Sequence, residues 1–187
     1  MLELRRIRVP RLYDPLYVKP PRNLRFEVRE RLDAQGNVVE PLIEDDVHQI
    51  AEALAAEEVE AVAVCLLHGY ANPDHESRVG EILRARFPDL FITLSVDILP
   101  QIREYERTST TVINAYVGPI VRQYLEGMTA DLRSIGCPAK VMMMQSSGGT
   151  TGAASVMEKP AQSLNVVRRQ ALSVRPTCAT CLGSKAP

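Results

Sequence analysis

The feature that most constrains this chain is residues 61–67, a run of seven residues without a polar side chain. A strand that is apolar at every position is typical of a sheet covered by helices on both faces. Two further short, mostly apolar runs, residues 91–96 and 140–145, come later in the chain. Each of the three is followed by a turn and then by helix-like spacing of apolar residues. This alternation predicts an α/β domain in which the three runs are strands of one sheet.

The segments around these strands have the periodicity of amphipathic helices. Residues 43–58 and 73–87 predict two helices, the second starting at Pro73 and ending at Pro88. A long helix is predicted after the strand at residues 91–96; it is broken or kinked at Gly118–Pro119 and runs to about residue 135, and residues 153–159 predict a short helix. The expected buried positions are Val47, Ile50, Ala51, Leu54 and Ala55; then Val79, Ile82, Leu83 and Ala85; and on the long helix Ile113, Val117, Ile120, Tyr124 and Met128.

The two ends of the chain differ from this central part in composition. Residues 1–22 are rich in Arg and Pro and predict an extended arm. Residues 24–32 and 38–42 predict a β-hairpin, with Gly36 or Asn37 at positive φ in the turn. Residues 164–187 combine Arg, Ser, Cys and Pro without a period and predict a disordered tail. The α/β domain therefore covers residues 23–163.

Composition excludes several classes of function. The net charge of −1 gives no signal for nucleic acid or for an anionic membrane. The apolar runs are too short to span a bilayer, and the first residues have no apolar core of a signal peptide. The four cysteines are scattered, which indicates cytoplasmic usage rather than a disulfide framework.

Polar residues follow each of the three predicted strands. Because the carboxyl ends of parallel strands share one edge of a sheet, we expect these residues to form one cluster that binds substrate. The glycines among them would let backbone N–H groups approach an anion. The candidates are His68 after the first strand; Arg103, Glu106 and Arg107 after the second; and Gln145, Ser146, Ser147, Gly148 and Gly149 after the third.

Simpler interpretations of the same residues stay open. Arg103 and Glu106 have the spacing of an ordinary helical ion pair. The hydroxyls of residues 108–111 can cap the long helix, and residues 145–149 can form a plain turn. We assign no catalytic residue. We also assign no metal site, because the spacing of His68 and His75 fits no standard ligand pattern.

Three blocks of sequence carry a resemblance to a known family. They are CLLHGYANPDHE at residues 65–76, LPQIREYERTSTTVINAYV at residues 99–117 and MQSSGG at residues 144–149. In this order they resemble the hydantoinase A/5-oxoprolinase family, over about residues 10–163. The chain would be an internal piece of the much longer family subunit.

The resemblance implies a fold and an activity. The fold is an incomplete ribonuclease H-like domain of the actin/hexokinase/Hsp70 type, with an N-terminal hairpin. The activity is the opening of a cyclic amide, such as a hydantoin or 5-oxoproline, driven by ATP and Mg²⁺. A partner subunit of the hydantoinase B type is also implied.

The chain departs from the family at its phosphate-binding loops. Family members carry two Gly-Gly-Thr loops, each preceded by Asp, whereas the one Gly-Gly-Thr here, residues 148–150, has no preceding Asp. We therefore expect neither ATP nor Mg²⁺ to bind this chain alone. The expected function is that of a partial subunit of a cyclic-amide hydrolase, inactive alone. The alternative is a non-catalytic α/β module that binds a small ligand or a partner subunit.

Overall fold

The central sheet has four strands in the order β2-β1-β5-β6. The computed structural model describes residues 2–4, 20, 22–137, 140–145 and 148–163. Strand β1 pairs antiparallel with β2 and with β5, and β5 pairs parallel with β6, Ala61 opposite Phe91 and Val64 opposite Leu94. The strands are β1 (Leu2–Leu4), β2 (Arg25–Phe26), β5 (Ala61–Val64) and β6 (Phe91–Leu94).

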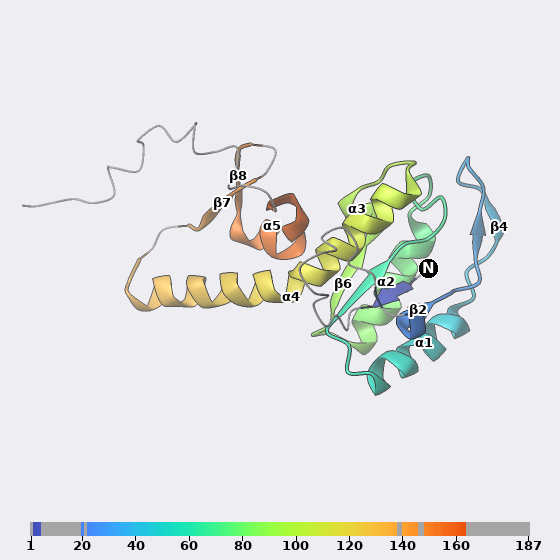
Figure 1. Ribbon diagram of the computed structural model, residues 1–187, viewed down its shortest axis with the longest axis horizontal. Coiled ribbons are helices and arrows are strands. Elements are labelled where there is room, and N and C mark those ends of the chain that lie inside the picture. The colour runs from blue at the N-terminus through green and yellow to red at the C-terminus, as the bar shows by residue number, and fades with distance from the viewer. Residues whose placement is uncertain (1, 5–19, 21, 138–139, 146–147, 164–187) are drawn as a thin grey trace, which may run out of the picture.

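Strand β5 is buried on both faces, as its apolar run predicted. Val62 and Val64 belong to the larger core with helices α1 (Glu44–Ala56) and α2 (Asp74–Arg86). Ala61 and Ala63 belong to a second core with Phe91 and the long helix α4 (Glu104–Ser134). Helices thus cover the sheet from both sides (Figure 1), and the predicted α/β class is confirmed.

Helices α1 and α2 have the predicted buried faces. Val47, Ile50, Ala51 and Leu54 are buried on α1, and Val79, Ile82 and Leu83 on α2. Ala55 and Ala85 are exposed, contrary to expectation, because each lies at the margin of the apolar stripe of its helix.

The predicted buried stripe of α4 is wrong. Ile113, Ile120 and Tyr124 are exposed, and most of the residues on the buried face are small or polar. The physical reason is close packing: a Cβ at Gly118 would overlap the Phe91 ring, so this face of the helix needs small side chains. The buried residues of α4 are Arg107, Thr111, Val112, Asn114, Ala115, Gly118 and Leu125.

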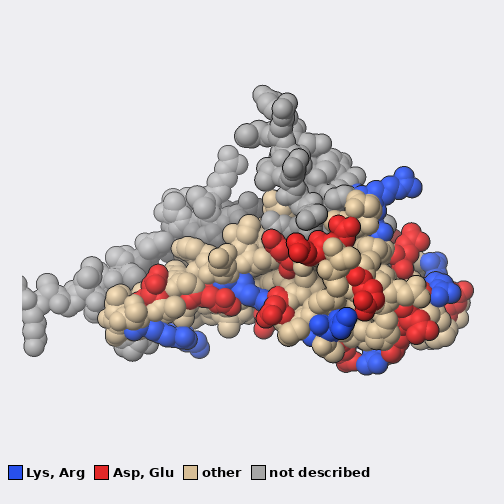
Figure 2. Space-filling view, turned by 90° about the horizontal axis from the view of Figure 1, so that it is seen from below, with Lys and Arg blue, Asp and Glu red and all other residues tan. Residues whose placement is uncertain are grey.

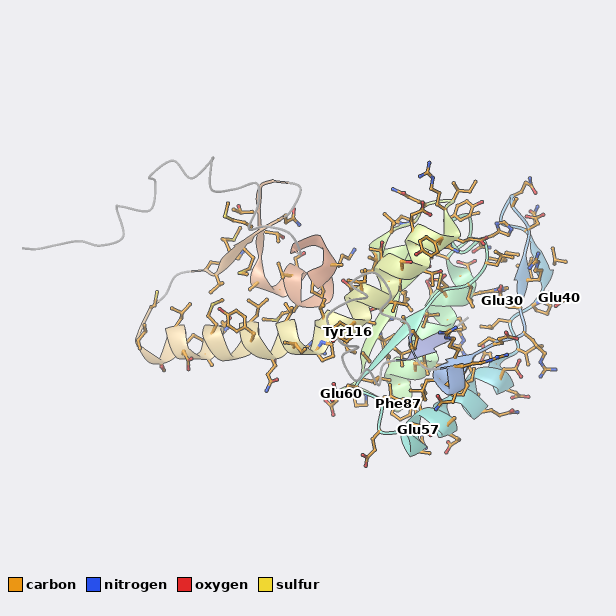
Figure 3. All side chains as sticks on the ribbon, viewed as in Figure 1. Glu30, Glu40, Glu57, Glu60, Phe87 and Tyr116 are labelled. Carbon is orange, nitrogen blue, oxygen red and sulfur yellow. The ribbon has the colours of Figure 1, made fainter. Side chains whose placement is uncertain are left out.

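Helix α4 is not broken at Gly118–Pro119, although its axis changes direction about halfway (Figure 1). Tyr116, which lies near this bend, is labelled in Figure 3. At 1.5 Å per residue a helix of 31 residues is about 46 Å long. Its second half therefore carries the chain beyond the sheet.

This displacement explains why residues 140–145 lie outside the central sheet. The sequence had predicted that they would join it. Strand β7 (Met142–Met144) pairs instead with β8 (Thr150–Gly152) in a separate antiparallel hairpin. Helix α5 (Ala153–Glu158), which confirms the predicted short helix, and the 3-10 turn η2 (Pro160–Ser163) then return to α4.

The N-terminal hairpin is confirmed, with Gly36 at φ +85° in its turn. It consists of β3 (Arg31–Leu32) and β4 (Val38–Glu40), whereas Arg25–Phe26 joins the central sheet after the short turn η1 (Arg22–Leu24). Leu2–Leu4 also form a strand of that sheet, which an extended arm does not predict. The expected tail, residues 164–187, lies outside the described residues.

Acidic and basic side chains both occur over the face shown in Figure 2, in keeping with the net charge of −1. Within the described residues, each helix is too short or too polar to cross a membrane.

Candidate functional site

The loop after β5 is tightly folded around His68. Its backbone oxygen accepts a hydrogen bond from Ala71 N at 2.9 Å, and Gly69 N donates to Leu66 O at 3.3 Å. His68 has φ +58°, a left-handed conformation that costs a side-chain-bearing residue about 1 kcal/mol or more. Its ring lies edge-on to that of Tyr70, with centroids 5.9 Å apart. Strain of this kind persists where the surrounding structure holds it, and it is concentrated at functional sites.

A buried carboxylate, Glu76, joins the ends of the two parallel strands. It accepts hydrogen bonds from Leu66 N at 2.8 Å, after β5, and from Val96 N at 3.2 Å, after β6. The Ser95 hydroxyl donates to both oxygens, at 2.7 and 3.0 Å. Burial raises the pKa of Glu76 above its usual range, and the hydrogen bonds and the charge of Arg107 oppose this rise.

Gly69 makes room for this carboxylate, because a Cβ at residue 69 would lie 2.6 Å from Glu76 Oε1. The glycine therefore lets the loop pass directly over the acid. The loop conformation and the buried charge depend on each other.

Arg107, in the first turn of α4, brings a buried positive charge to the same place. Its Nη2 donates to Leu66 O at 2.7 Å, and its guanidinium carbon lies 5.6 Å from the centroid of the Tyr70 ring. The residue is only 1% exposed, yet Nε and Nη1 have no hydrogen-bond partner in the described part of the chain. A buried polar group left unpaired costs about 1–3 kcal/mol, and more when it is charged. This arrangement favours an acceptor supplied from outside these residues.

The hydroxyls after Arg107 do not cap α4, so that interpretation is wrong. The cap position is Arg103, which makes no side-chain cap hydrogen bond. Thr111 Oγ1 donates to the backbone oxygen of Arg107 at 2.7 Å, and Thr108 Oγ1 lies 3.0 Å from Cys65 Sγ. These contacts fix the turn that carries Arg107 against the end of β5.

The structure separates the other predicted site residues from this place. Arg103 and Glu106 form an exposed helical ion pair at 3.6 Å, the simpler of the two interpretations. Gln145 lies at the end of β7, in the separate hairpin (Figure 1), so the expected single cluster is wrong at this point. Gly148 and Gly149, both at φ +92°, form its exposed turn. Ser146 and Ser147 lie outside the described residues.

The N-terminal hairpin closes one side of the loop. Asn72 Nδ2 donates to Gly36 O at 3.1 Å, and His75 Nδ1 lies 2.8 Å from Glu30 Oε2. Glu30 lies beside the hairpin, away from Glu60 at the amino end of β5 (Figure 3). The loop is thus held at the carboxyl edge of the sheet.

Sequence reasoning found His68 and Arg107 but missed Glu76. The signal was present, because Glu76 precedes Val79 and Leu83 at helical spacing and so lies on the apolar face of α2. A carboxylate at a buried position requires partners. Among the described residues, no three His, Cys, Asp or Glu side chains are placed to hold a metal ion.

Two family models match the chain. Residues 1–87 match the hydantoinase/oxoprolinase N-terminal region, and residues 107–165 match hydantoinase/oxoprolinase. The second match begins at Arg107.

Individual proteins are similar over most of this chain. An uncharacterized protein of Methanocaldococcus jannaschii is 41% identical over 165 residues, which are 86% of this chain and 24% of that protein. Caprolactamase subunit alpha of Pseudomonas jessenii is 34% identical over 82% of this chain and 22% of its own length. The chain thus spans about a quarter of the length of these relatives.

Two solved structures have the same fold over this region. The crystal structure of the ATP-dependent caprolactamase from Pseudomonas jessenii matches 83% of this chain and 23% of its own, with a TM-score of 0.72 and 32% identity. The nucleotide-free structure of acetone carboxylase matches 79% of this chain and 21% of its own, with a TM-score of 0.68 and 31% identity.

Proposed function

Because this chain belongs to the hydantoinase/oxoprolinase family, we propose that it is part of a subunit of an ATP-dependent cyclic-amide hydrolase and is inactive alone. The relatives support the class of reaction, since they include an ATP-dependent caprolactamase. The similar acetone carboxylase structure concerns ATP-dependent acetone carboxylation, so dependence on ATP is common to the two relatives.

The observation that carries the proposal is the buried Arg107 with its unpaired Nε and Nη1. Opening of a cyclic amide develops negative charge on the carbonyl oxygen, and a fixed guanidinium in a water-poor site stabilises such charge strongly. Glu76 and Leu66 hold Arg107 and the loop in one arrangement. In this proposal Arg107 contacts the reacting oxygen, and His68 and Tyr70 form the outer wall of the site.

The described residues around the Gly-Gly-Thr turn do not fit ATP or Mg²⁺. The Gly148–Thr150 turn forms an exposed hairpin tip, and no Asp precedes it. Backbone N–H groups in such a turn do not by themselves position a γ-phosphate and its metal ion. We therefore derive no phosphoryl-transfer step from these residues, and nucleotide binding in the proposal belongs to other parts of the enzyme.

A second candidate is a non-catalytic module that binds a partner subunit. The exposed Ile113, Ile120 and Tyr124 on α4 favour it, because large apolar side chains on one helix face are typical of an interface. The two candidates differ in the role of Arg107, which only the first places against the substrate.

The test has two arms. The purified chain, with Mg²⁺-ATP and a panel of cyclic amides, should release no phosphate above background. Next, the chain replaces the matching segment of the Pseudomonas jessenii caprolactamase subunit, and the chimera should open caprolactam. Arg107→Ala should lower kcat of the chimera by about a hundredfold or more, and Arg103→Ala, four residues earlier and exposed, should leave it within about twofold. Turnover by the isolated chain, or equal activity of both variants, would contradict the proposal.

A further inference from the structure

A second polar site lies along the outer edge of β6. A cavity of about 470 Å³ opens there between the strand and helices α2, α3 (Ser95–Ile98), α4 and α5. Strand β6 is the last strand of its sheet among the described residues. The strand forms the floor of the cavity, and charged side chains from all four helices and the residue after α5 form its walls.

The walls carry both signs of charge. Within the described part of the chain, none of the five charged side chains makes an ion pair. They are three cations, Arg84, Arg122 and Lys159, and two carboxylates, Asp97 and Glu158. They come from four helices, with Glu158 and Lys159 adjacent at the end of α5, so the fold brings four separate segments to one cavity.

One of these cations is held in place. The guanidinium carbon of Arg122 lies 4.7 Å from the centroid of the buried Phe91 ring. Stacking of this kind orders the side chain while leaving its N–H groups available. The cavity therefore offers a positioned donor for a carboxylate, and the two acidic side chains offer acceptors for an ammonium group.

We propose that this cavity binds a zwitterionic amino acid of the kind that ring opening of a simple lactam releases. Hydrolysis adds one water across the amide C–N bond. The carbonyl carbon becomes a carboxylate, the nitrogen takes the protons as an ammonium, and the product carries one charge of each sign at its two ends. The identity of this ligand rests on the proposed function, because only that reaction supplies such a product. Binding of such a ligand depends on the charges of the cavity and not on the ring-opening reaction itself.

The cavity also has a connection to the site at the strand ends. Helix α3 contributes Ser95, whose hydroxyl donates to Glu76, and Asp97, which lines the cavity. A ligand that binds Asp97 therefore contacts the same short helix that holds the buried carboxylate.

Isothermal titration of the full chain tests the proposal with three probes of equal chain length. They are 6-aminohexanoate, hexanoate and hexylamine, and inorganic phosphate serves as a polyanion. The zwitterion should bind at least about tenfold more tightly than either singly charged probe, since each end meets an opposite charge. Arg122→Ala and Arg84→Ala should each weaken it about fivefold or more. Arg86→Ala, on the same helix as Arg84 but paired with Glu52, should not change it.

Several results would overturn the proposal. Hexanoate binding as tightly as the zwitterion would make the cavity a simple carboxylate site, and tighter phosphate binding would make it a polyanion site. A loss of binding in Arg86→Ala as large as that in Arg84→Ala would also reject it. So would the absence of any binding heat with all of the probes. Zwitterion binding to a chain whose chimera fails to open caprolactam would retain the cavity and reject the proposed function. An active chimera, together with no zwitterion binding by the chain, would retain the proposed function and reject the cavity as a binding site.

Discussion

Replacing Glu76 by Gln should destabilise the chain strongly, by an amount that its hydrogen bonds determine. The carboxylate accepts from two backbone N–H groups and one hydroxyl while fully buried. A Gln amide keeps one oxygen acceptor but turns an NH₂ group toward at least one of these donors. An unpaired buried donor costs about 1–3 kcal/mol, so the loss for Gln should be about 1–3 kcal/mol.

The pH dependence of this loss has a definite sign. Burial raises the pKa of Glu76 above 4.5, so in the interval above pH 4.5 the folded chain binds more protons at this residue than the unfolded chain. The contribution of Glu76 is therefore full below pH 4.5 and decreases as the pH rises through its folded pKa. Gln does not titrate, so the difference in unfolding free energy between the native sequence and Glu76→Gln should be largest at low pH.

Urea unfolding followed by circular dichroism, at several pH values from 4 to 7, measures this difference. Glu81→Gln is the matched control on the same helix, because Glu81 is exposed and only pairs with Arg78, at 3.0 Å. It should change stability by no more than about 0.5 kcal/mol. A loss at Glu76 no larger than that of the control, or one that grows with pH, would refute the reasoning.

Three further predictions concern single positions. Gly118→Ala should cost about 1–3 kcal/mol, because its Cβ overlaps a buried ring, whereas Gly127→Ala on the same helix meets no atom within 4 Å and should stabilise by about 0.5–1 kcal/mol in thermal unfolding. Asp46 has its pKa lowered to about 2 by hydrogen bonds from Arg29, so Asp46→Asn should lose stability at pH 7 and match the native chain near pH 2 in acid titration. His68→Gly should remove the left-handed strain and raise stability by about 1 kcal/mol, while lowering kcat of the chimera.

The parts of the fold that the sequence predicted are those governed by local patterns. Strand β5 was evident because residues buried on both faces must be apolar throughout, and β6 because it is a short, mostly apolar run. The buried face of α4 was not, because close packing against Ala61 and Ala63 selects small side chains, and periodicity of large apolar residues points to another face. The pairing of β7 with β8 depends on where a long helix delivers the chain, which no local pattern records.

The candidate site divides in the same way. The strand-end rule located His68, in the loop after β5, and Arg107, in the first turn of the long helix that follows β6 and α3. It failed for Gln145, because that rule assumes a shared sheet. Glu76 was not predicted, because its partners, Leu66 N and Val96 N, are backbone groups. The type of residue at a position does not reveal that its backbone N–H binds a carboxylate.

Leu66 connects the two buried charges without using its side chain. Its N–H donates to the acid and its C=O accepts from the arginine, so the peptide units of one residue join the two groups. The leucine side chain only fills space in this connection. Any apolar residue of similar volume would therefore preserve it, and proline, which has no N–H, would break it without touching either charged side chain.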